Sequence, residues 1–199
     1  MKHICIYGAS SNAIDKKYLD ETGRLGELMA KRGFGLVFGG GANGVMGAVA
    51  RGVRRGGGHI IGIAPSFFDT DGILYKECDE FIYPDTMRER KMLFEQKSDA
   101  IISAPGGIGT FDEFFEIITR KQLGLTNKAI VLLNLYGYYD PLIAAVENAI
   151  GQHFAPVGTA EIFKVCGTCE EALDYIASYI PPKIDTEDAV KARALSKQN

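Results

Sequence analysis

The sequence predicts an α/β protein with a doubly wound parallel sheet of about seven strands and helices on both faces. Short apolar runs alternate with amphipathic stretches along the chain, which is the pattern of strand–helix–strand units. The runs are continuously apolar rather than alternating, as in parallel strands that helices cover on both sides. Three runs lead into glycine-rich or small-residue segments, and such loops bind ligands at the carboxyl ends of parallel strands.

Seven apolar runs are the expected strands, and amphipathic stretches between them are the expected helices. Met46, Val49 and Val53, for example, recur at helical spacing. The strands are expected over residues 3–8, 34–39, 59–65, 80–84, 100–105, 129–134 and 161–166, and helices over residues 15–32, 43–55 and 140–153.

The chain of 199 residues suits one domain, which we expect to span residues 1–182, with a polar tail at 183–199. The net charge of −3 disfavours a nucleic-acid partner, because non-specific binding needs an excess of Lys and Arg. No apolar segment approaches the roughly 20 residues of a membrane span. The first apolar run is also too short for the core of a signal peptide. We therefore expect a cytoplasmic protein with no nucleic-acid partner and no membrane partner.

The cysteines and histidines do not form a pattern typical of metal ligands. Cys166 and Cys169 form a CxxC pair, which is either a redox motif or two small residues at a strand-to-helix turn. The turn is the simpler interpretation. No second CxxC and no HxxxH completes a zinc site, and the three histidines are scattered. We expect no metal.

Two of the small-residue loops are YGASSN, after the first strand, and FGGGANGVMG, after the second. Gly40 and Gly41 would let the backbone approach a ligand, and a helix that begins near Asn43 would offer N–H groups to an anion. The spacing differs from the dinucleotide-binding GxGxxG, and the Gly-Lys-Ser/Thr of a P-loop is lacking. A tight turn with close helix–strand packing explains these glycines equally well.

The third loop, PGGIGT, is a stronger candidate for binding a phosphate. Gly106 and Gly107 free the backbone, and Gly109 and Thr110 open a helix. A helix N-terminus favours an anion by about 0.3–1 kcal/mol, and each hydrogen bond to a charged group adds about 1.5–3 kcal/mol. A remote phosphate is gripped similarly in the ground and transition states, so the chemistry must come from neighbouring residues.

Carboxylates follow at once in the same expected helix, at Asp112, Glu113 and Glu116. Carboxylates near a helix N-terminus stabilise its dipole, and this explanation suffices for Asp112. Glu113 shares a helical face with Ile117. A carboxylate held there, one turn from a phosphate site, could act on a ribose.

A second group of candidates lies in TMRERKMLFEQKSD, residues 86–99. Met87, Arg90, Lys91 and Phe94 form a single stripe at helical spacing, so two cations share a stripe with two apolar residues. One explanation is a solvated face with the cationic stems lying over apolar neighbours. The other is that the cations point into a cleft.

The two segments together resemble the paired MxxRK and PGGxGTxxE motifs of the LOG family, whose members were long described as possible lysine decarboxylases. The likeness includes GASS, VFGGGANGVMG, QLG and LLNLYGYYDPL, and it extends to about residue 180. It implies a Rossmann-like fold, usually a homodimer, and no cofactor. It also implies hydrolysis of nucleoside 5′-monophosphates to a free base and ribose 5-phosphate, with N6-substituted adenines as characteristic bases.

Carried onto this chain, the resemblance implies catalytic roles for Arg90 and Glu113. Two departures concern substrate preference: Arg120 follows Thr119 where members often have Trp, and residues 66–79 do not align with the family's base-side loop. The residues expected to bind substrate are Gly8, Ser10, Gly40, Gly41, Met87, Lys91, Gly106, Gly107, Gly109, Thr110 and Thr119.

We therefore expect a hydrolase that cleaves the N-glycosidic bond of AMP or its N6-modified derivatives. The alternative is a non-catalytic carrier of a nucleotide or of a molybdopterin-like cofactor, because the same fold and phosphate loops would serve it. Glu113 argues against the carrier, which has little use for a carboxylate beside Arg90. A pyridoxal-dependent decarboxylase needs a Schiff-base lysine, and no lysine of the sequence has such a context.

Overall fold

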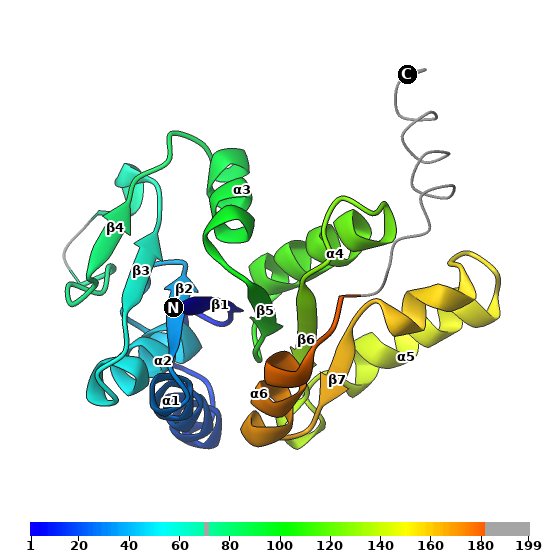
Figure 1. The fold of residues 1–199 in the computed structure, drawn as a ribbon, viewed down its shortest axis with the longest axis horizontal. Helices are drawn as coiled ribbons and strands as arrows, with labels where there is room; N and C mark the ends of the chain where they lie inside the picture. Colours follow the sequence, from blue (N-terminus) through cyan, green and yellow to red (C-terminus); the bar gives the residue numbers. More distant parts are fainter. Residues whose placement is uncertain (70–71, 182–199) are drawn as a thin grey trace.

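A computed structural model describes residues 1–69 and 72–181, and the tail expected at 183–199 lies outside the described residues. Seven strands form one all-parallel sheet in the order β4-β3-β2-β1-β5-β6-β7, which confirms the predicted fold class (Figure 1). The strands are β1 (Lys2–Tyr7), β2 (Phe34–Phe38), β3 (Ile60–Ile63), β4 (Glu80–Ile82), β5 (Ala100–Ser103), β6 (Ala129–Leu133) and β7 (Lys164–Cys166).

The helices cover the two faces of this sheet in two groups, α1, α2 and α6 on one side and α3, α4 and α5 on the other. They are α1 (Lys16–Lys31), α2 (Gly44–Arg55), α3 (Met87–Lys97), α4 (Ile108–Gln122), α5 (Asp140–Gly151) and α6 (Cys169–Ser178). Short 3-10 turns are η1 (Ser66–Phe68), η2 (Leu135–Gly137) and η3 (Val157–Glu161).

The strand order reverses beside β1, which pairs with β2 on one side and with β5 on the other. In open parallel sheets, the loops on either side of such a switch point leave a crevice for ligands. Tyr7 at the end of β1 lies in register with Ser103 at the end of β5. The sheet therefore brings the loops after β1, β2 and β5 to one edge.

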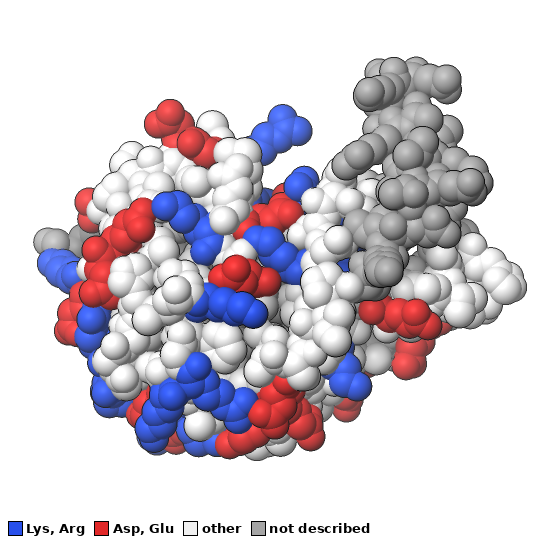
Figure 2. All heavy atoms as spheres, in the orientation of Figure 1, with Lys and Arg blue, Asp and Glu red and all other residues white. Residues whose placement is uncertain are grey.

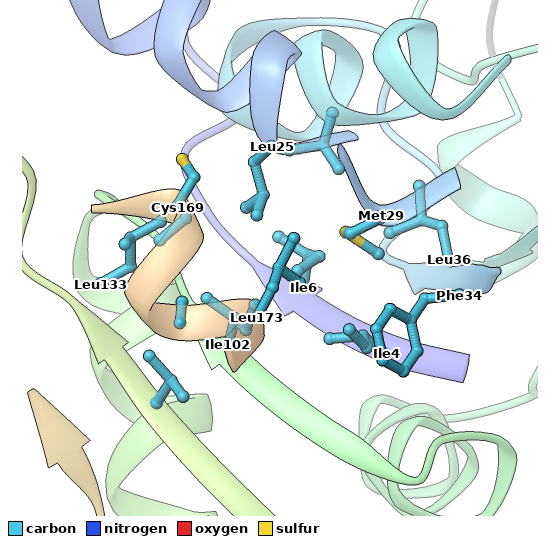
Figure 3. Close-up of a cluster of buried hydrophobic side chains, with 14 of the residues drawn as sticks. Ile4, Ile6, Leu25, Met29, Phe34, Leu36, Ile102, Leu133, Cys169 and Leu173 are labelled. Carbon is cyan, nitrogen blue, oxygen red and sulfur yellow. The ribbon is translucent and has the colours of Figure 1, made fainter. Parts of the chain in front are cut away.

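Each face of the sheet has its own apolar cluster. On the first face, Leu25 and Met29 of α1 pack over Ile4 and Ile6 of β1, next to Leu173 of α6 (Figure 3). On the second face, residues of α3, α4 and α5 pack on the alternate residues of the same strands. Because both faces are covered, the strands are continuously apolar, as the sequence predicted.

Helices α1 and α2 pack backbone against backbone at glycines. A methyl group at Gly26 would overlap the carbonyl oxygen of Val49, and one at Gly52 would overlap the carbonyl oxygen of Gly23. This contact fixes α2, and with it the loop that joins α2 to β2, close to the sheet.

The first strand has the expected length but begins one residue earlier than expected, and the other six are one to three residues shorter than expected. Residues 161–166 were expected to form a strand, but β7 begins at Lys164 because η3 extends through Glu161. Ile162 and Phe163 are apolar because they pack against the second cluster, not because they belong to the sheet.

The surface charge is mixed, and acidic and basic side chains alternate over the face that Figure 2 shows. Among the described residues, none of the helices has the length and apolar character that crossing a membrane requires.

Candidate active site

A cleft of about 610 Å³ lies at the carboxyl edge of the sheet, at the switch point. The loops after β1, β2 and β5 form its walls, together with the segment that follows β3 and with side chains from α3 and α4. Of the residues expected at the site, those that line the cleft are Gly8, Ser10, Gly41, Arg90, Gly107, Gly109, Thr110 and Glu113.

The N-terminus of α4 opens into this cleft. Gly107 is its N-cap and leaves the first turn without a side-chain cap. A methyl group at Gly107 or Gly109 would meet no described atom within 4 Å, so the space before the helix is open. The N–H groups of this first turn, with the helix dipole, form a site for an anion such as a phosphate.

Gly106 and Thr110 close the inner side of the same loop. The Thr110 side chain packs against the α-carbon of Gly106 so closely that a methyl group there would overlap its hydroxyl oxygen. Thr110 is buried and lines the cleft, whereas Gly106 does not line it. The two residues therefore differ in place: Thr110 lies against the cleft, and Gly106 shapes the turn that carries it.

Two tyrosines hold this loop from behind. The hydroxyl of Tyr138 donates to the carbonyl oxygen of Gly106 at 2.6 Å, and the hydroxyl of Tyr139 donates to that of Ala104 at 2.6 Å. Tyr136, just before them, has a left-handed backbone with φ of 56°, a strained conformation for a residue other than glycine. Sequence reasoning noticed LLNLYGYYDPL only as part of the resemblance and gave these tyrosines no role.

The N-terminus of α2 is less open than that of α4. The N–H of Gly44 donates to Asn12 Oδ1 at 2.8 Å, and the N–H of Met46 donates to the carbonyl oxygen of Ala9 at 3.2 Å. The left-handed Gly44, with φ of 60°, permits this close approach of the two loops. The chain itself therefore occupies N–H groups that the sequence suggested for an anion.

Arg90 enters the cleft from the first turns of α3. The N-cap Thr86 accepts a hydrogen bond from the N–H of Glu89 and starts the helix at Met87. The Arg90 guanidinium donates to the carbonyl oxygens of Ile63 at 3.0 Å and Gly39 at 3.4 Å. A methyl group at Gly39 would overlap the guanidinium in this position, so a larger residue there would displace Arg90.

Glu113 faces Arg90 from α4. Arg90 Nη1 and Glu113 Oε1 are 3.5 Å apart, and the two side chains are 11% and 14% exposed. Burial raises the pKa of the Glu113 carboxyl to about 7, against the attraction of Arg90 and Lys91. Burial also lowers the pKa of Arg90, and Glu113 opposes that effect. The pair therefore consists of a carboxyl group that titrates near neutral pH and an arginine that is held beside it.

Lys91 points to the other side of Glu113. Lys91 Nζ is 2.6 Å from Asp112 Oδ2 and 2.7 Å from Glu116 Oε2, and it lines a small separate cavity rather than the cleft. Arg90 and Lys91 are thus neighbours in the sequence, but Arg90 lies in the cleft and Lys91 lies on the far side of Glu113.

The remaining expected substrate residues are outside the cleft lining. Met87 and Thr119 are exposed on α3 and α4. Gly40 is left-handed, with φ of 74°, and packs against the ring of Phe81. Arg120, which replaces the family's frequent Trp, pairs with Glu95 at 2.7 Å.

The wall opposite α4 is apolar and comes largely from the segment after β3. Phe68, Ile73 and Leu74 line the cleft, next to Met46 of α2. The carbonyl oxygen of Ile73 accepts the N–H of Ala42 at 2.8 Å, which ties this segment to the glycine-rich loop after β2. The sequence analysis noted only that residues 66–79 do not align with the family's base-side loop, which concerns substrate preference, and it named none of them as a contact.

The described residues contain no cluster of three or more His, Cys, Asp or Glu side chains that could hold a metal ion. Cys166 and Cys169 are buried free thiols, and burial raises their pKa values to about 11 and 12. A buried thiol that resists ionisation is a poor nucleophile, so their positions agree with the turn rather than with the redox motif.

Comparison with known proteins identifies relatives over nearly the whole chain. Residues 46–176 match the protein family described as "Possible lysine decarboxylase". The chain is 34% identical over 184 residues to a probable cytokinin riboside 5′-monophosphate phosphoribohydrolase of Oryza sativa subsp. japonica, covering 92% of this chain and 75% of the relative. It is 33% identical over 184 residues to a cytokinin riboside 5′-monophosphate phosphoribohydrolase of Arabidopsis thaliana, covering 92% and 86%.

Among solved structures, the molybdenum cofactor binding protein from Rippkaea orientalis superposes with a TM-score of 0.69 at 22% identity, covering 89% of this chain and 96% of that one. That likeness concerns the fold alone. The family match and the curated relatives go further, and they confirm the resemblance that the sequence motifs indicated. The chain belongs to the LOG family, the family described as possible lysine decarboxylase.

Proposed function

We propose that this protein is a phosphoribohydrolase that cleaves the N-glycosidic bond of AMP or an N6-modified AMP, releasing the base and ribose 5-phosphate. One observation carries the proposal: the Arg90–Glu113 pair, 3.5 Å apart, lies in the same cleft as the uncapped N-terminus of α4. The curated relatives from rice and Arabidopsis bear the name of that activity.

The cleft divides naturally into three parts for such a substrate. The 5′-phosphate would lie at the first turn of α4, with the N–H groups of Gly109 and Thr110 around it. The base would lie against the apolar wall that includes Ile73 and Leu74. The ribose would then lie between them, within reach of Glu113.

Glu113 would act on the ribose as the bond to the base breaks. Its carboxylate would stabilise the positive charge that develops on the ribosyl group and take a proton from the attacking water. Water would give one proton to Glu113 and add its oxygen to the anomeric carbon. The base would leave with the electrons of the N-glycosidic bond and take up a proton from solvent, and Glu113 would later return its own proton to solvent. Arg90, held by two backbone carbonyls, would keep the carboxylate in place and favour its ionised form.

The family's older description fits the cleft less well. A lysine decarboxylase of the pyridoxal type holds its cofactor through a Schiff-base lysine. None of the described residues that line the cleft is a lysine. The residues present therefore do not fit that cofactor.

The test is a panel of AMP, GMP, CMP, N6-isopentenyl-AMP and adenosine, with base and ribose 5-phosphate both quantified. We expect equimolar release of both products from the AMP compounds and much slower release from adenosine, which lacks the phosphate that α4 would bind. Tight binding of AMP with no ribose 5-phosphate after prolonged incubation would instead favour the non-catalytic carrier.

We further propose that the protein is a cytoplasmic homodimer whose two subunits contact each other through α4. Ile108, Phe115 and Leu123 fall on one side of α4 and are 80%, 39% and 45% exposed. Phe154 and Val157, which follow α5, are 88% and 77% exposed. A second copy of this chain would bury these side chains. The free cysteines, of which Cys5, Cys166 and Cys169 are buried, suit a reducing compartment.

A further inference from the structure

A second, much smaller cavity lies behind Glu113. Its volume is about 10 Å³, which is at the lower limit of the space that one water molecule needs. Tyr7, Lys91 and Glu116 are among the side chains around it, and we name it the rear cavity. Glu113 lines both the rear cavity and the cleft, so its side chain borders a space for substrate on one side and a water-sized space on the other.

Two consecutive residues of α3 lie on opposite sides of this carboxylate. Arg90 lines the cleft, and Lys91 lines the rear cavity. Lys91 is only 20% exposed and is held by Asp112 and Glu116, at 2.6 Å and 2.7 Å. The Lys91 ammonium is therefore held behind Glu113 by two carboxylates that are themselves partly open to solvent, at Asp112 and Glu116.

We propose that Lys91 and Glu116 are positioning residues that set the charge state of Glu113 from the rear cavity, where a water molecule exchanges its proton while substrate fills the cleft. The inference rests on the proposed function, in which Glu113 takes a proton from water. While substrate fills the cleft, the side of Glu113 that faces the cleft is covered, and the carboxyl needs another route by which to return its proton to solvent. The rear cavity is the route that the described residues offer.

The groups that face Glu113 come from several elements. Burial raises the pKa values of Cys5 and Tyr7, so both stay uncharged near neutral pH, and Tyr139 does so for the same reason. The charged groups around it are Arg90 and Lys91 of α3 and Asp112 and Glu116 of α4, and the Glu95–Arg120 ion pair completes the rear cavity.

Among these charges, Lys91 and Glu116 act in opposite directions. Lys91 lowers the pKa of Glu113, whereas Glu116 and Asp112 raise it. Neutralising Lys91 therefore raises the pKa of Glu113, and neutralising Glu116 lowers it. Neutralising a partner of an ion pair that does not border Glu113, such as Lys97–Glu80, would leave the pKa of Glu113 unchanged.

The experiment follows the titration of Glu113 directly, by the carbon-13 signal of its side-chain carboxyl. Glu113→Gln, which lacks that signal, assigns it. We expect Lys91→Met to raise the apparent pKa by about 0.5–1 unit and Glu116→Gln to lower it by a similar amount. Lys97→Met is the matched control, since Lys97 also lies on α3 and pairs with a carboxylate, Glu80, at 3.1 Å.

The same shifts should appear in the pH profile of kcat/KM for AMP, while Lys97→Met leaves the profile unchanged. Titrations of Lys91→Met and Glu116→Gln that coincide with that of Lys97→Met would overturn the inference. If Lys91→Met does not fold, Glu116→Gln alone decides, because its carboxylate is 42% exposed. Opposite shifts without base release from any variant would support the inference and reject the proposed function.

Discussion

The position of Glu113 links the stability of the protein to pH. Burial raises the pKa of its carboxyl to about 7, whereas an unfolded chain releases that proton near the ordinary value of 4.5. Between these two values the folded state binds more protons than the unfolded state, so the contribution of Glu113 to stability falls as pH rises. Above about pH 7 the full cost of an ionised, buried carboxylate is present.

Glu113→Gln should therefore change the pH dependence of unfolding. Relative to the variant, the wild type should lose roughly 2–3 kcal/mol of unfolding free energy between pH 4.5 and pH 8. Denaturant titrations at several pH values measure this difference. Glu147→Gln, which removes an exposed carboxylate of α5, is the control. A wild-type-minus-variant difference that stays constant across this range would contradict the burial of a proton-binding Glu113.

The sequence could predict that Arg90 and Glu113 lie in a cleft. A cation on a helical stripe with apolar residues is unusual, and so is a carboxylate just after a glycine-rich loop. The sequence could not separate Arg90 from Lys91. Neighbouring residues on a helix differ in direction by about 100°, and only the packing of α3 against α4 decides which one enters the cleft. The apolar wall at Ile73 and Leu74 carries no local signal and depends on tertiary contacts.

At the scale of elements, the turn after β6 supports the loop before α4. Tyr138 donates to the carbonyl oxygen of Gly106, the residue just before the N-cap of α4. The strained Tyr136 and the left-handed Gly137, with φ of 56° and 73°, form the turn that places Tyr138. The edge of Tyr138 also packs against Tyr18 of α1.

Tyr138→Phe should weaken phosphate binding more than chemistry. Loss of one neutral hydrogen bond corresponds to about a three- to tenfold rise in KM for AMP, with kcat little changed, because the phosphate is held similarly in the ground and transition states. Cleavage of adenosine should be unaffected. Steady-state kinetics of the variant test this, with Tyr175→Phe on α6 as control. An equal loss for AMP and adenosine would show that Tyr138 does not act through the phosphate loop.

Strands and helices were predictable because each is marked by an apolar pattern of its own period. The start of β7 was not, because Ile162 and Phe163 are apolar for packing outside the sheet. The sequence left the N-terminus of α2 open between an anion site and a tight turn. The hydrogen bonds that Gly44 and Met46 donate to Asn12 and Ala9 join segments far apart in the sequence, so they could not be predicted.

At the scale of the whole molecule, the all-parallel topology gathers the candidate site at one switch point and leaves α4 with two roles. Its N-terminus and Glu113 face the cleft, and Phe115 and Leu123 on another side of the helix are exposed to solvent. If a second copy covers that side, the site helix is fixed from both directions.

Phe115→Glu should therefore shift the protein from dimer to monomer. A charge in an apolar interface leaves a desolvated carboxylate without a partner, which outweighs the gain from the remaining contacts. Sedimentation analysis over a range of concentrations measures the change, with Phe67→Glu on η1, where Phe67 is 65% exposed, as control. A wild-type protein that stays monomeric at every concentration would contradict the proposed homodimer.

The measurement that tests the central claim most directly compares Glu113→Gln with Asp112→Asn, two neighbouring carboxylates changed to their isosteric amides. At pH 8.5, with AMP, Glu113→Gln should lose roughly 10²–10⁴-fold in base release while it still binds AMP. Asp112→Asn should stay within about threefold of the wild type, since Asp112 is 59% exposed and exposed ion pairs contribute little. Wild-type release of adenine and ribose 5-phosphate by Glu113→Gln would contradict the assignment of Glu113 as the catalytic carboxylate.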